Sequence, residues 1–294
     1  MEIISYDKIQ MNSSVVALGK FEGLHKGHML LINKLTQLSK QYDFKSVVFT
    51  INIDREKRIN LPNERFEILE KSGIDIAAEC NFSEEFAGIS YDSFIKDFLV
   101  NKLNAKYVVV GKDFQFGYKR LGTVESLIAY GKKFGFDVIA FDKMKYNNEI
   151  ISSSAIRELI TDGNVIDAYG MLGRYYSITG KVCYGKQLGR TIGFPTANII
   201  PDSGKLLPGF GVYETRLEID GKIYKGMTNI GNNPTVQKSD NVFVETHIID
   251  YCGDLYNKQI KIEFLRYIRE ERKFSSVEEL TKQLNSDKKT ITHQ

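Results

Sequence analysis

The stretch Gly19-Lys20-Phe21-Glu22-Gly23-Leu24-His25-Lys26-Gly27-His28 predicts the fold of the first half of the chain. It follows the apolar run Val15–Leu18, which is typical of a buried strand, and it precedes Met29–Leu35, whose apolar spacing is that of a helix. Two histidines therefore fall among three glycines at a strand-to-helix junction. An open parallel α/β sheet binds its ligand at such a junction, where the N–H groups of the helix attract phosphate. Imidazole donors there can also stabilise charge that develops on a phosphate oxygen during a reaction.

Short apolar strands alternate with helices on both sides of this loop, up to about residue 170. We expect strands at 15–18, 46–50, 74–79, 107–110 and 136–141, and helices at 29–42, 63–72, 91–102 and 123–134. This alternation predicts βαβ units and a doubly wound parallel sheet. A further helix is expected at 154–162, with Gly163 as its C-terminal stop.

The second half of the chain has short strands separated by glycine and proline turns. Strands are expected at 175–184, 211–219, 222–229, 242–250 and 259–269, and Asp220-Gly221 is a two-residue hairpin signal. Four prolines lie in loop-like contexts: Pro195, Pro201, Pro208 and Pro234. The pattern predicts a small antiparallel β-barrel followed by an amphipathic helix at 276–287. We therefore expect two domains, 1–172 and 173–294.

The composition is that of a globular protein whose substrates are small molecules. The 294 residues suffice for two domains, and 40 basic residues against 37 acidic ones give a net charge of only +3. No basic arm or stripe stands out, so a nucleic-acid partner is not indicated. Cys80, Cys183 and Cys252 lie far apart and form neither a zinc nor a redox motif. The pattern shows no signal peptide and no membrane span, so we expect a cytoplasmic protein; its oligomeric state is left open.

Two further segments of the first domain carry groups that suit phosphate. Ile151–Arg157 places three serine hydroxyls just before a helix and an arginine in its first turn, where they can hold and neutralise phosphates. Gly111–Gly117 follows a predicted strand at the same edge of the sheet. Taken alone, the serines are more typical of a helix cap, Arg157 of a solvated helix surface, and the two histidines could merely cap their helix. The combination favours a phosphate site.

The motif H-x-G-H with a later I-S-S-[ST]-x-I-R resembles the nucleotidyltransferase superfamily, whose members join a nucleotide to a phosphate ester. This chain carries the motifs at His25–His28 and Ile151–Arg157, with Ser154 in place of the usual threonine. The resemblance implies in-line attack of an acceptor phosphate on the α-phosphorus of ATP, with pyrophosphate as the leaving group. Catalysis then depends on positioning and charge stabilisation.

The second domain has its own distinctive block at Gly185–Asn198. Thr196 and Asn198 alternate on an extended segment and therefore face the same side. A hydroxyl and an amide oxygen together suit Mg²⁺, which prefers oxygen ligands and phosphates, and the glycines allow the backbone to approach a ligand closely. The alternative interpretation of this block is a β-bulge loop with polar turn residues.

Glu245 is the candidate general base of the second domain. It lies in the predicted strand 242–250, and its apolar neighbours suggest that it shares the inward-facing side with Phe243 or leans into a pocket. A carboxylate in that place can accept a proton from a substrate hydroxyl. A glutamate in a strand is more often on a solvated face, which remains the alternative.

These blocks resemble riboflavin kinases, and the two halves in this order resemble the bacterial bifunctional enzymes that make FMN and then FAD. The matching blocks are Gly185–Asn198, Gly211–Tyr213, Asn229–Thr235, Val244–His247 and Arg269–Phe274. The resemblance implies riboflavin, FMN and ATP as substrates, FAD as product and Mg²⁺ as cofactor. In the kinase it assigns Glu245 as base for the ribityl 5′-hydroxyl, Thr196 and Asn198 as ligands of Mg²⁺ and ATP phosphates with Gly185 and Gly193 beside them, and Arg269 as a flavin contact. In the adenylyltransferase it assigns His25 and His28 to catalysis, ATP binding to Gly19, Phe21, His25, Gly27, His28, Ser153, Ser154 and Arg157, and flavin binding to Asp113 and Phe116.

The first domain departs from the family pattern in two places. Lys20 and Glu22 stand where the family usually has asparagine and aspartate, and Phe49–Arg55 lacks the proline- and histidine-containing stretch that follows this strand in the family. These departures favour one alternative, a monofunctional riboflavin kinase with a weak or structural first domain. A second alternative, a regulator that binds flavin or nucleotide without catalysis, is disfavoured by Thr196, Asn198 and Glu245.

Overall fold

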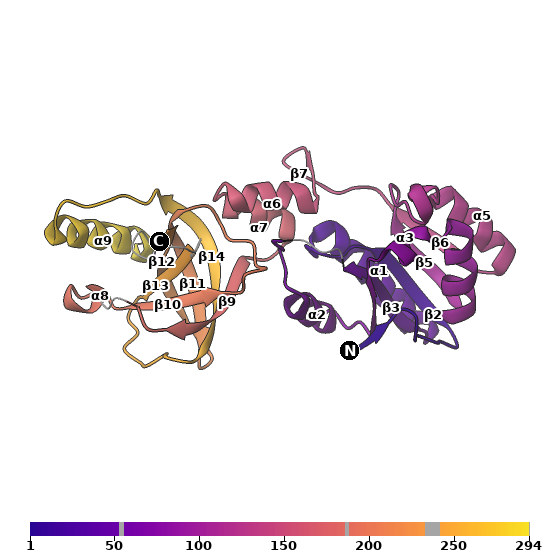
Figure 1. Cartoon of the computed structure of the whole chain (residues 1–294), viewed down its shortest axis with the longest axis horizontal. Helices are drawn as coiled ribbons and strands as arrows, with labels where there is room; N and C mark the ends of the chain where they lie inside the picture. Colours follow the sequence, from indigo (N-terminus) through magenta and orange to yellow (C-terminus); the bar gives the residue numbers. More distant parts are fainter. Residues whose placement is uncertain (53–55, 186–187, 233–241, 294) are drawn as a thin grey trace. The chain divides into compact units, whose positions relative to one another are not determined.

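The computed structural model describes residues 1–52, 56–185, 188–232 and 242–293, which form two compact units, Met1–Ser153 and Ser154–Gln294 (Figure 1). Parts of three segments discussed above, residues 53–55, 186–187 and 233–235, lie outside the described residues, as does Pro234. Within the described part of the chain, no helix is both long and apolar enough to cross a membrane.

The first unit is built on a six-stranded parallel sheet in the order β1-β4-β3-β2-β5-β6. The strands are β1 (Glu2–Ser5), β2 (Ser14–Gly19), β3 (Lys45–Asn52), β4 (Ile76–Asn81), β5 (Ala105–Gly111) and β6 (Asp137–Phe141). The strand β2 pairs with β3 on one side and β5 on the other, so the winding direction reverses at β2. The expected doubly wound sheet is confirmed, and the histidine loop leaves β2 at its switch point, where such sheets bind ligands.

The two faces of this sheet are covered by different helices because side chains alternate along each strand. Val15 and Ala17 pack with α1 (Lys26–Tyr42), whereas Val16 and Leu18 pack with η1 (Phe94–Lys102). The remaining helical elements of the unit are α2 (Pro62–Lys71), α3 (Glu84–Gly88), α4 (Tyr91–Ser93), η2 (Tyr118–Arg120) and α5 (Val124–Phe134), and β7 (Lys145–Tyr146) with β8 (Glu149–Ile150) forms a small hairpin. Strand β2 is thus buried on both faces and fixes where the histidine loop starts.

Some elements of the first unit differ from the sequence expectation. The edge strand β1 was not predicted, and β4 begins and ends two residues later than predicted. The helix expected at 91–102 begins as the short turn α4 and continues as a π-helix from Phe94, with Phe94, Ile95, Phe98 and Leu99 buried. The hydrophobic spacing therefore indicated the buried face correctly but not the wider winding of this helix.

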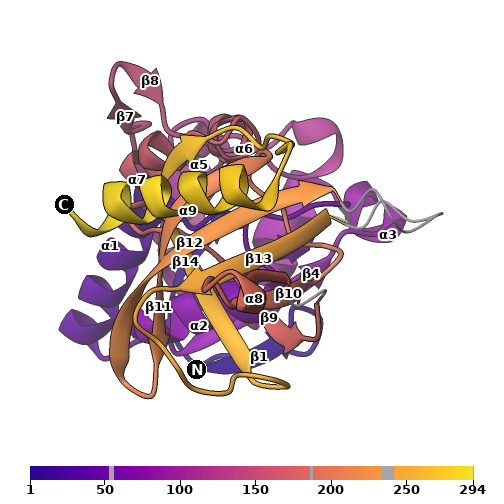
Figure 2. The same cartoon turned by 90° about the vertical axis from the view of Figure 1, so that its left-hand side faces the viewer.

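The second unit contains a closed antiparallel barrel in the order β10-β13-β12-β11-β14-β9, which confirms the predicted barrel. Its strands are β9 (Tyr176–Cys183), β10 (Thr196–Pro201), β11 (Gly211–Ile219), β12 (Lys222–Asn232), β13 (Val242–Ile248) and β14 (Gln259–Arg269). The helices are α6 (Ser153–Thr161), α7 (Val165–Leu172), α8 (Leu188–Thr191) and α9 (Val277–Thr292). Figure 2 shows α9 lying across the barrel near β12 and β14.

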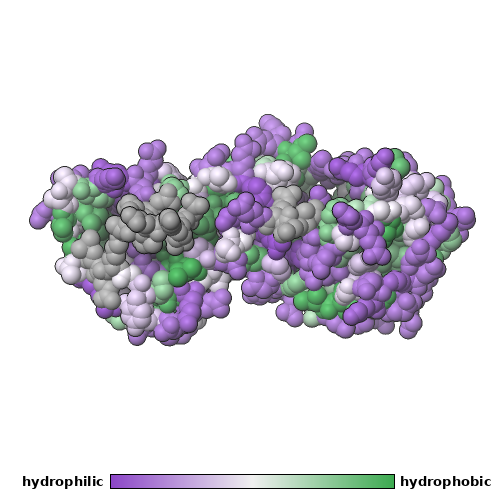
Figure 3. All heavy atoms as spheres, viewed as in Figure 1, coloured by the Kyte–Doolittle hydropathy of each residue, from purple (hydrophilic) through white to green (hydrophobic). Residues whose placement is uncertain are grey.

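The turns of this unit follow their sequence signals with one exception. Asp220 and Gly221, with φ of 52° and 77°, form the expected tight hairpin between β11 and β12, and Gly163 ends its helix with φ of 77°. Pro201, expected in a loop, instead ends β10, where strand ends tolerate a residue without an N–H group. The face seen in Figure 3 is mostly hydrophilic, with small hydrophobic patches on each unit.

Candidate active sites

The histidine loop joins β2 to α1 through two residues with unusual backbone conformations. Phe21 and Leu24 have φ of 46° and 43°, although both side chains are completely buried. A Cβ at Gly19 would lie 3.0 Å from the Phe21 ring, so the glycine leaves room for this tight turn. Left-handed conformations cost energy in residues with side chains and are common at functional sites. The core contacts of Phe21 and Leu24 hold the loop in this shape.

The two histidines of the loop lie against each other at the start of α1. Their rings stack with centroids 3.7 Å apart and planes 17° apart, and the Phe21 ring lies 5.1 Å from His28. His25 is the N-cap of α1, where its Nδ1 accepts a hydrogen bond from the His28 N–H group at 3.3 Å. A nitrogen that accepts carries no proton, so neutral His25 has its proton on Nε2. His25 therefore caps α1, which is one of the two roles considered from the sequence. The Nε2–H group of the same ring is a donor at the helix N-terminus.

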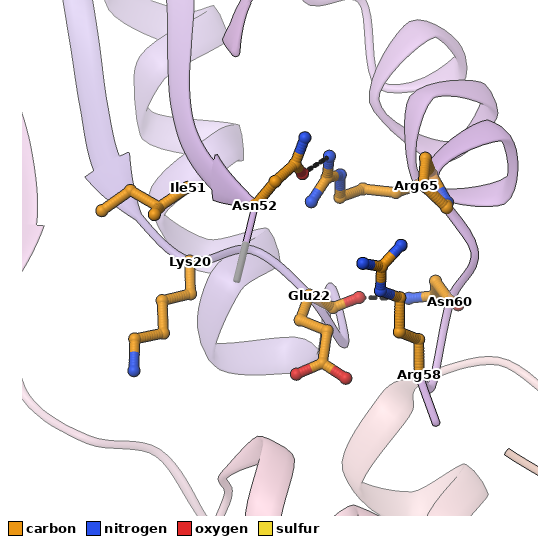
Figure 4. A pocket seen from close by; sticks show the side chains of 8 residues that line it. Lys20, Glu22, Ile51, Asn52, Arg58, Asn60 and Arg65 are labelled. Atoms are coloured by element: carbon orange, nitrogen blue, oxygen red, sulfur yellow. Dashed lines mark hydrogen bonds between the residues drawn. The ribbon is translucent and has the colours of Figure 1, made fainter. Parts of the chain in front are cut away.

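A charged pocket adjoins the histidine loop at the carboxyl edge of the sheet (Figure 4). We call it the loop pocket; its lining residues are Lys20, Glu22, Ile51, Asn52, Arg58, Asn60, Pro62 and Arg65. Both positions at which the loop departs from the family pattern, Lys20 and Glu22, contribute to it. Three cations and one carboxylate line the pocket, which favours an anionic group.

The structure fixes the polar groups of the loop pocket through contacts between distant segments. Glu22 accepts a hydrogen bond from the Ile59 N–H group with its carboxylate (3.3 Å) and from Asn60 Nδ2 with its backbone oxygen (2.7 Å). Arg65 is buried and donates to Asn52 Oδ1 (2.6 Å) and Glu79 Oε1 (3.3 Å). Burial lowers the pKa of Arg65 from its usual value, and Glu79 opposes this shift.

The other predicted residues of the first site have different surroundings. Ser153 comes close to the loop, since a Cβ at Gly23 would lie 3.2 Å from its Oγ, whereas Ser154 and Arg157 belong to the second compact unit in α6. Asp113 is exposed and pairs with Lys143 at 2.9 Å. Phe116 is buried beside Phe94 and Phe114 in the core.

The barrel contains a cavity lined by three of the six residues predicted for the second site, Thr196, Glu245 and Arg269. We call it the barrel cavity; its lining residues are Gly189, Ile192, Phe194, Thr196, Val212, Met227, Asn229, Glu245, His247, Arg269, Glu271, Arg272, Phe274, Leu280 and Leu284. Thr196 in β10 and Glu245 in β13 come from neighbouring strands, with Asn198 paired directly opposite Glu245. The half-buried Glu245 lines the cavity, as the sequence suggested.

The glycine block beside this cavity brings its polar groups together. Asn198 Nδ2 lies 3.5 Å from Thr196 Oγ1, so both side chains are on one face of β10, as predicted. A Cβ at Gly185 would lie 2.3 Å from the Asn198 amide nitrogen, which shows why this position is glycine. Gly193 has φ of 82°, a conformation that side chains disfavour.

Comparisons with known proteins cover both halves of the chain. The family model described as riboflavin kinase matches residues 172–294, and the one described as FAD synthetase matches residues 7–155. A bifunctional riboflavin kinase/FMN adenylyltransferase from Listeria monocytogenes is 34% identical over 94% of this chain and 90% of its own length. The chain belongs to the bifunctional riboflavin kinase/FMN adenylyltransferase family. It phosphorylates riboflavin to FMN with ATP, then transfers an adenylyl group from ATP to FMN, which yields FAD and pyrophosphate.

Further relatives agree with this assignment. The bifunctional riboflavin kinase/FMN adenylyltransferase from Buchnera aphidicola subsp. Acyrthosiphon pisum is 33% identical over 94% of this chain and 91% of its own length. A crystal structure titled as a macrolide-efflux protein from Streptococcus pneumoniae matches with a TM-score of 0.90 and 30% identity, over 99% of both chains. That likeness supports the fold of each unit, while the curated relatives and family models name the activity. Since both halves match, neither a kinase alone nor a non-catalytic regulator is favoured.

Two cavity residues of this bifunctional enzyme were not singled out from the sequence. Asn229 lies directly opposite Glu245 in the β12–β13 register, and its Nδ2 donates to Glu271 Oε1 at 3.3 Å. Asn229 Oδ1 is buried without a hydrogen-bond partner among the described residues, so it can accept a hydrogen bond from a ligand. Both residues lie inside blocks that resemble riboflavin kinases, and this resemblance could have marked them as candidates. Their spacing in the sequence could not show that they lie beside Glu245.

His247 forms part of the cavity wall two residues after Glu245. Its Nδ1 lies 2.9 Å from the Pro195 carbonyl oxygen, which accepts a hydrogen bond and fixes the protonated nitrogen. Burial lowers the pKa of His247 from its usual value, while this hydrogen bond acts in the opposite direction. The ring centroid of His247 lies 5.0 Å from that of Phe194. This packing supports the strand that also carries Glu245.

Proposed function

We propose that the barrel cavity is the riboflavin kinase site, within a kinase domain of residues 173–294, and that residues 1–172 form the FMN adenylyltransferase domain. The observation that carries the first assignment is that Thr196 and Glu245 line one cavity together with apolar side chains such as Met227 and Leu284. Polar groups at one part of the wall suit a phosphoryl transfer, and apolar walls suit a flavin ring. The match of residues 172–294 to the riboflavin kinase model supports this proposal.

In this site Glu245 acts as the general base. Its carboxylate accepts the proton of the ribityl 5′-hydroxyl as that oxygen attacks the γ-phosphorus of ATP, and ADP leaves with the electron pair of the broken P–O bond. Asn229, opposite Glu245, supplies an acceptor for a second hydroxyl of the substrate. Arg269 lines the same cavity as a flavin contact at its edge.

The residues on β10 fit a magnesium ion. Thr196 and Asn198 offer a hydroxyl and an amide oxygen on one face, and the lack of a side chain at Gly185 makes room for the Asn198 amide. Mg²⁺ typically takes few protein ligands and completes its shell with water and substrate phosphates. We propose that Thr196 and Asn198 hold Mg²⁺ with the ATP phosphates, near Gly185 and Gly193; the bound ion would neutralise phosphate charge.

In the adenylyltransferase, we propose that the histidine loop binds the ATP phosphates. The Nε2 side of His25, the His28 ring and the N–H groups at the start of α1 form a donor cluster for the triphosphate, with Gly19, Phe21 and Gly27 shaping the loop. The cations of the loop pocket favour an anionic substrate nearby. For Ser153, Ser154 and Arg157 in ATP binding, and for Asp113 and Phe116 in flavin binding, the proposal rests on the resemblance.

We also propose that the enzyme works in the cytoplasm. The three cysteines are free thiols, and Cys80 is buried with its pKa raised to about 12 by burial, so it stays an unreactive thiol. Free thiols of this kind are typical of a reducing compartment.

The assignment of the two sites is tested with one variant in each. Glu245→Gln removes the base but keeps the size of the side chain, and we expect riboflavin phosphorylation to fall by about 10²- to 10⁴-fold. The conversion of FMN to FAD by the same variant should stay within about twofold of the parent enzyme, since the loss is confined to one site. Chromatography of the flavins after incubation with ATP and Mg²⁺ measures both steps.

His28→Ala is the matched variant in the other site. We expect it to lower FAD formation from FMN by about 10²-fold, while FMN formation from riboflavin is retained. Equal loss of both activities in either variant would contradict two separate sites, and a fully active Glu245→Gln kinase would exclude Glu245 as the base.

A further inference from the structure

One continuous segment supplies much of the wall of the barrel cavity. Six of the fifteen lining residues lie between positions 269 and 284, from the end of β14 into the middle of α9. They are Arg269, Glu271, Arg272, Phe274, Leu280 and Leu284. We call residues 269–287 the wall segment. The remaining lining residues come from positions 189–247, and beyond Arg269, the last residue of β14, the segment is not paired with a barrel strand.

A buried ion pair joins the two ends of the wall segment. Arg269 Nε and Nη2 donate to Asp287 Oδ2 at 2.9 and 2.8 Å, and the Asp287 side chain is only 3% exposed. Asp287 Oδ1 accepts from Gln283 Nε2 at 2.7 Å, so both carboxylate oxygens are hydrogen-bonded. Arg269 Nη1 donates to the Glu270 carbonyl oxygen. Since removing one partner of a buried pair leaves the other charge uncompensated, this contact strongly favours the closed segment.

The C-terminal end of α9 is attached to the barrel independently of this pair. Lys225 Nζ in β12 donates to the Ile291 carbonyl oxygen at 2.7 Å, and Arg266 Nη2 in β14 donates to the Thr290 carbonyl oxygen at 2.9 Å. Cations at these unpaired carbonyls also complement the helix dipole. Loss of Asp287 therefore releases the wall segment while the end of the helix stays in place.

We propose that Asp287 is a positioning residue for riboflavin: through Arg269 it holds the wall segment closed against the flavin. The proposal rests on the assignment of the barrel cavity to the kinase. Phe274, Leu280 and Leu284 are the apolar side chains that the segment contributes to the cavity wall, and they suit the flavin ring. Thr196 and Glu245 lie on β10 and β13, which the ion pair does not hold. Release of the segment should thus weaken riboflavin binding and leave the phosphoryl-transfer groups in position.

The test compares Asp287→Asn with Glu278→Gln in the full-length enzyme. Both variants replace a carboxylate of α9 by an amide of similar size, but Glu278 is exposed in the first turn, so it serves as the matched control. We expect Asp287→Asn to raise the KM for riboflavin about tenfold, with kcat and the KM for ATP changed less than twofold. Glu278→Gln should resemble the parent enzyme, and FMN adenylylation should be unaffected in both.

A double variant separates positioning from general destabilisation. If Asp287 acts through Arg269, adding Arg269→Gln to Asp287→Asn should raise the KM for riboflavin no further than Arg269→Gln alone. The proposal is overturned if Asp287→Asn behaves like Glu278→Gln, or if both KM values, kcat and thermal stability change together. Leu280→Asp tests the underlying assignment: an unchanged KM for riboflavin in that variant would show that the flavin binds elsewhere.

Discussion

At the scale of single residues, His25 combines a structural and a chemical role. Its Nδ1 caps α1 by accepting from the His28 N–H group, and this contact directs the opposite nitrogen away from the helix. The cap also orders the ring, which stacks on His28. A donor that is already oriented loses little entropy when it binds a phosphate oxygen, and this is what electrostatic stabilisation of a transition state requires. Capping and catalysis are therefore compatible explanations of the same residue.

The two roles of His25 can be separated by substitution. Asparagine is a good N-cap, so His25→Asn should keep the thermal stability of the parent, whereas His25→Ala should lose about 1 kcal/mol of stability. Both variants lack the imidazole donor, and we expect both to lose about 10²-fold or more in FMN adenylylation. The measurements are thermal unfolding and FAD formation from FMN. Retained activity in His25→Asn would show that the histidine only caps the helix.

Some predicted site residues have partners in the folded protein that the sequence does not reveal. Arg269 was predicted as a flavin contact and lines the cavity, but its guanidinium is also bonded to Asp287, eighteen residues later. Asp113 pairs with Lys143 at the surface. Such partners depend on the tertiary fold, so a motif can locate a residue along the chain without stating what else it binds.

At the scale of secondary-structure elements, the buried strands could be predicted well, whereas the edge strand β1 could not. Strand β2 is apolar on both of its faces, with Val15 and Ala17 on one and Val16 and Leu18 on the other, because both faces are covered. The position of this strand was correctly predicted. The edge strand β1 has the sequence Glu-Ile-Ile-Ser with mostly exposed side chains, and it forms only because β4 offers parallel hydrogen bonds. Pairing of that kind leaves no periodic signal in a four-residue stretch.

The barrel interior holds a chain of threonine hydroxyls that ties three strands together. Thr228 in β12 is hydrogen-bonded to Thr215 in β11 at 2.7 Å and to Thr246 in β13 at 2.8 Å, and all three are fully buried. Valine has the same shape without the hydroxyl. Thr228→Val would therefore leave two buried hydroxyls short of a partner, a loss of about 1–3 kcal/mol of barrel stability.

This loss is measurable as a shift of the urea unfolding transition of the barrel, followed by circular dichroism. Thr179→Val, at a half-buried position of β9, is the control and should change stability by less than about 0.5 kcal/mol. The urea concentration that abolishes adenylyltransferase activity should stay constant, because that activity belongs to the other domain. Unchanged barrel stability in Thr228→Val would mean that these hydroxyl contacts contribute nothing net.

At the scale of the whole molecule, the two activities are expected to depend on two separate sets of side chains. The residues that line the barrel cavity all lie within the unit Ser154–Gln294, and those that line the loop pocket lie within Met1–Ser153. Among the described residues, the lining of each cavity thus comes from one unit. FMN is the product of one reaction and the substrate of the other, so it must leave one site before it reacts in the second.

This independence predicts that two defective variants restore the full pathway when they are mixed. We expect Glu245→Gln to make FMN from riboflavin, and His28→Ala to make FAD from FMN, at least about 10²-fold more slowly than the parent enzyme, so either variant alone should yield little FAD from riboflavin. In a mixture, FMN released by His28→Ala should be adenylylated by Glu245→Gln, and FAD should appear after a lag in which free FMN accumulates. The lag should shorten as the concentration of Glu245→Gln rises, because transfer through solution is concentration-dependent. Absence of FAD from the mixture, with each variant still performing its own step, would show that FMN does not pass freely from one molecule to another.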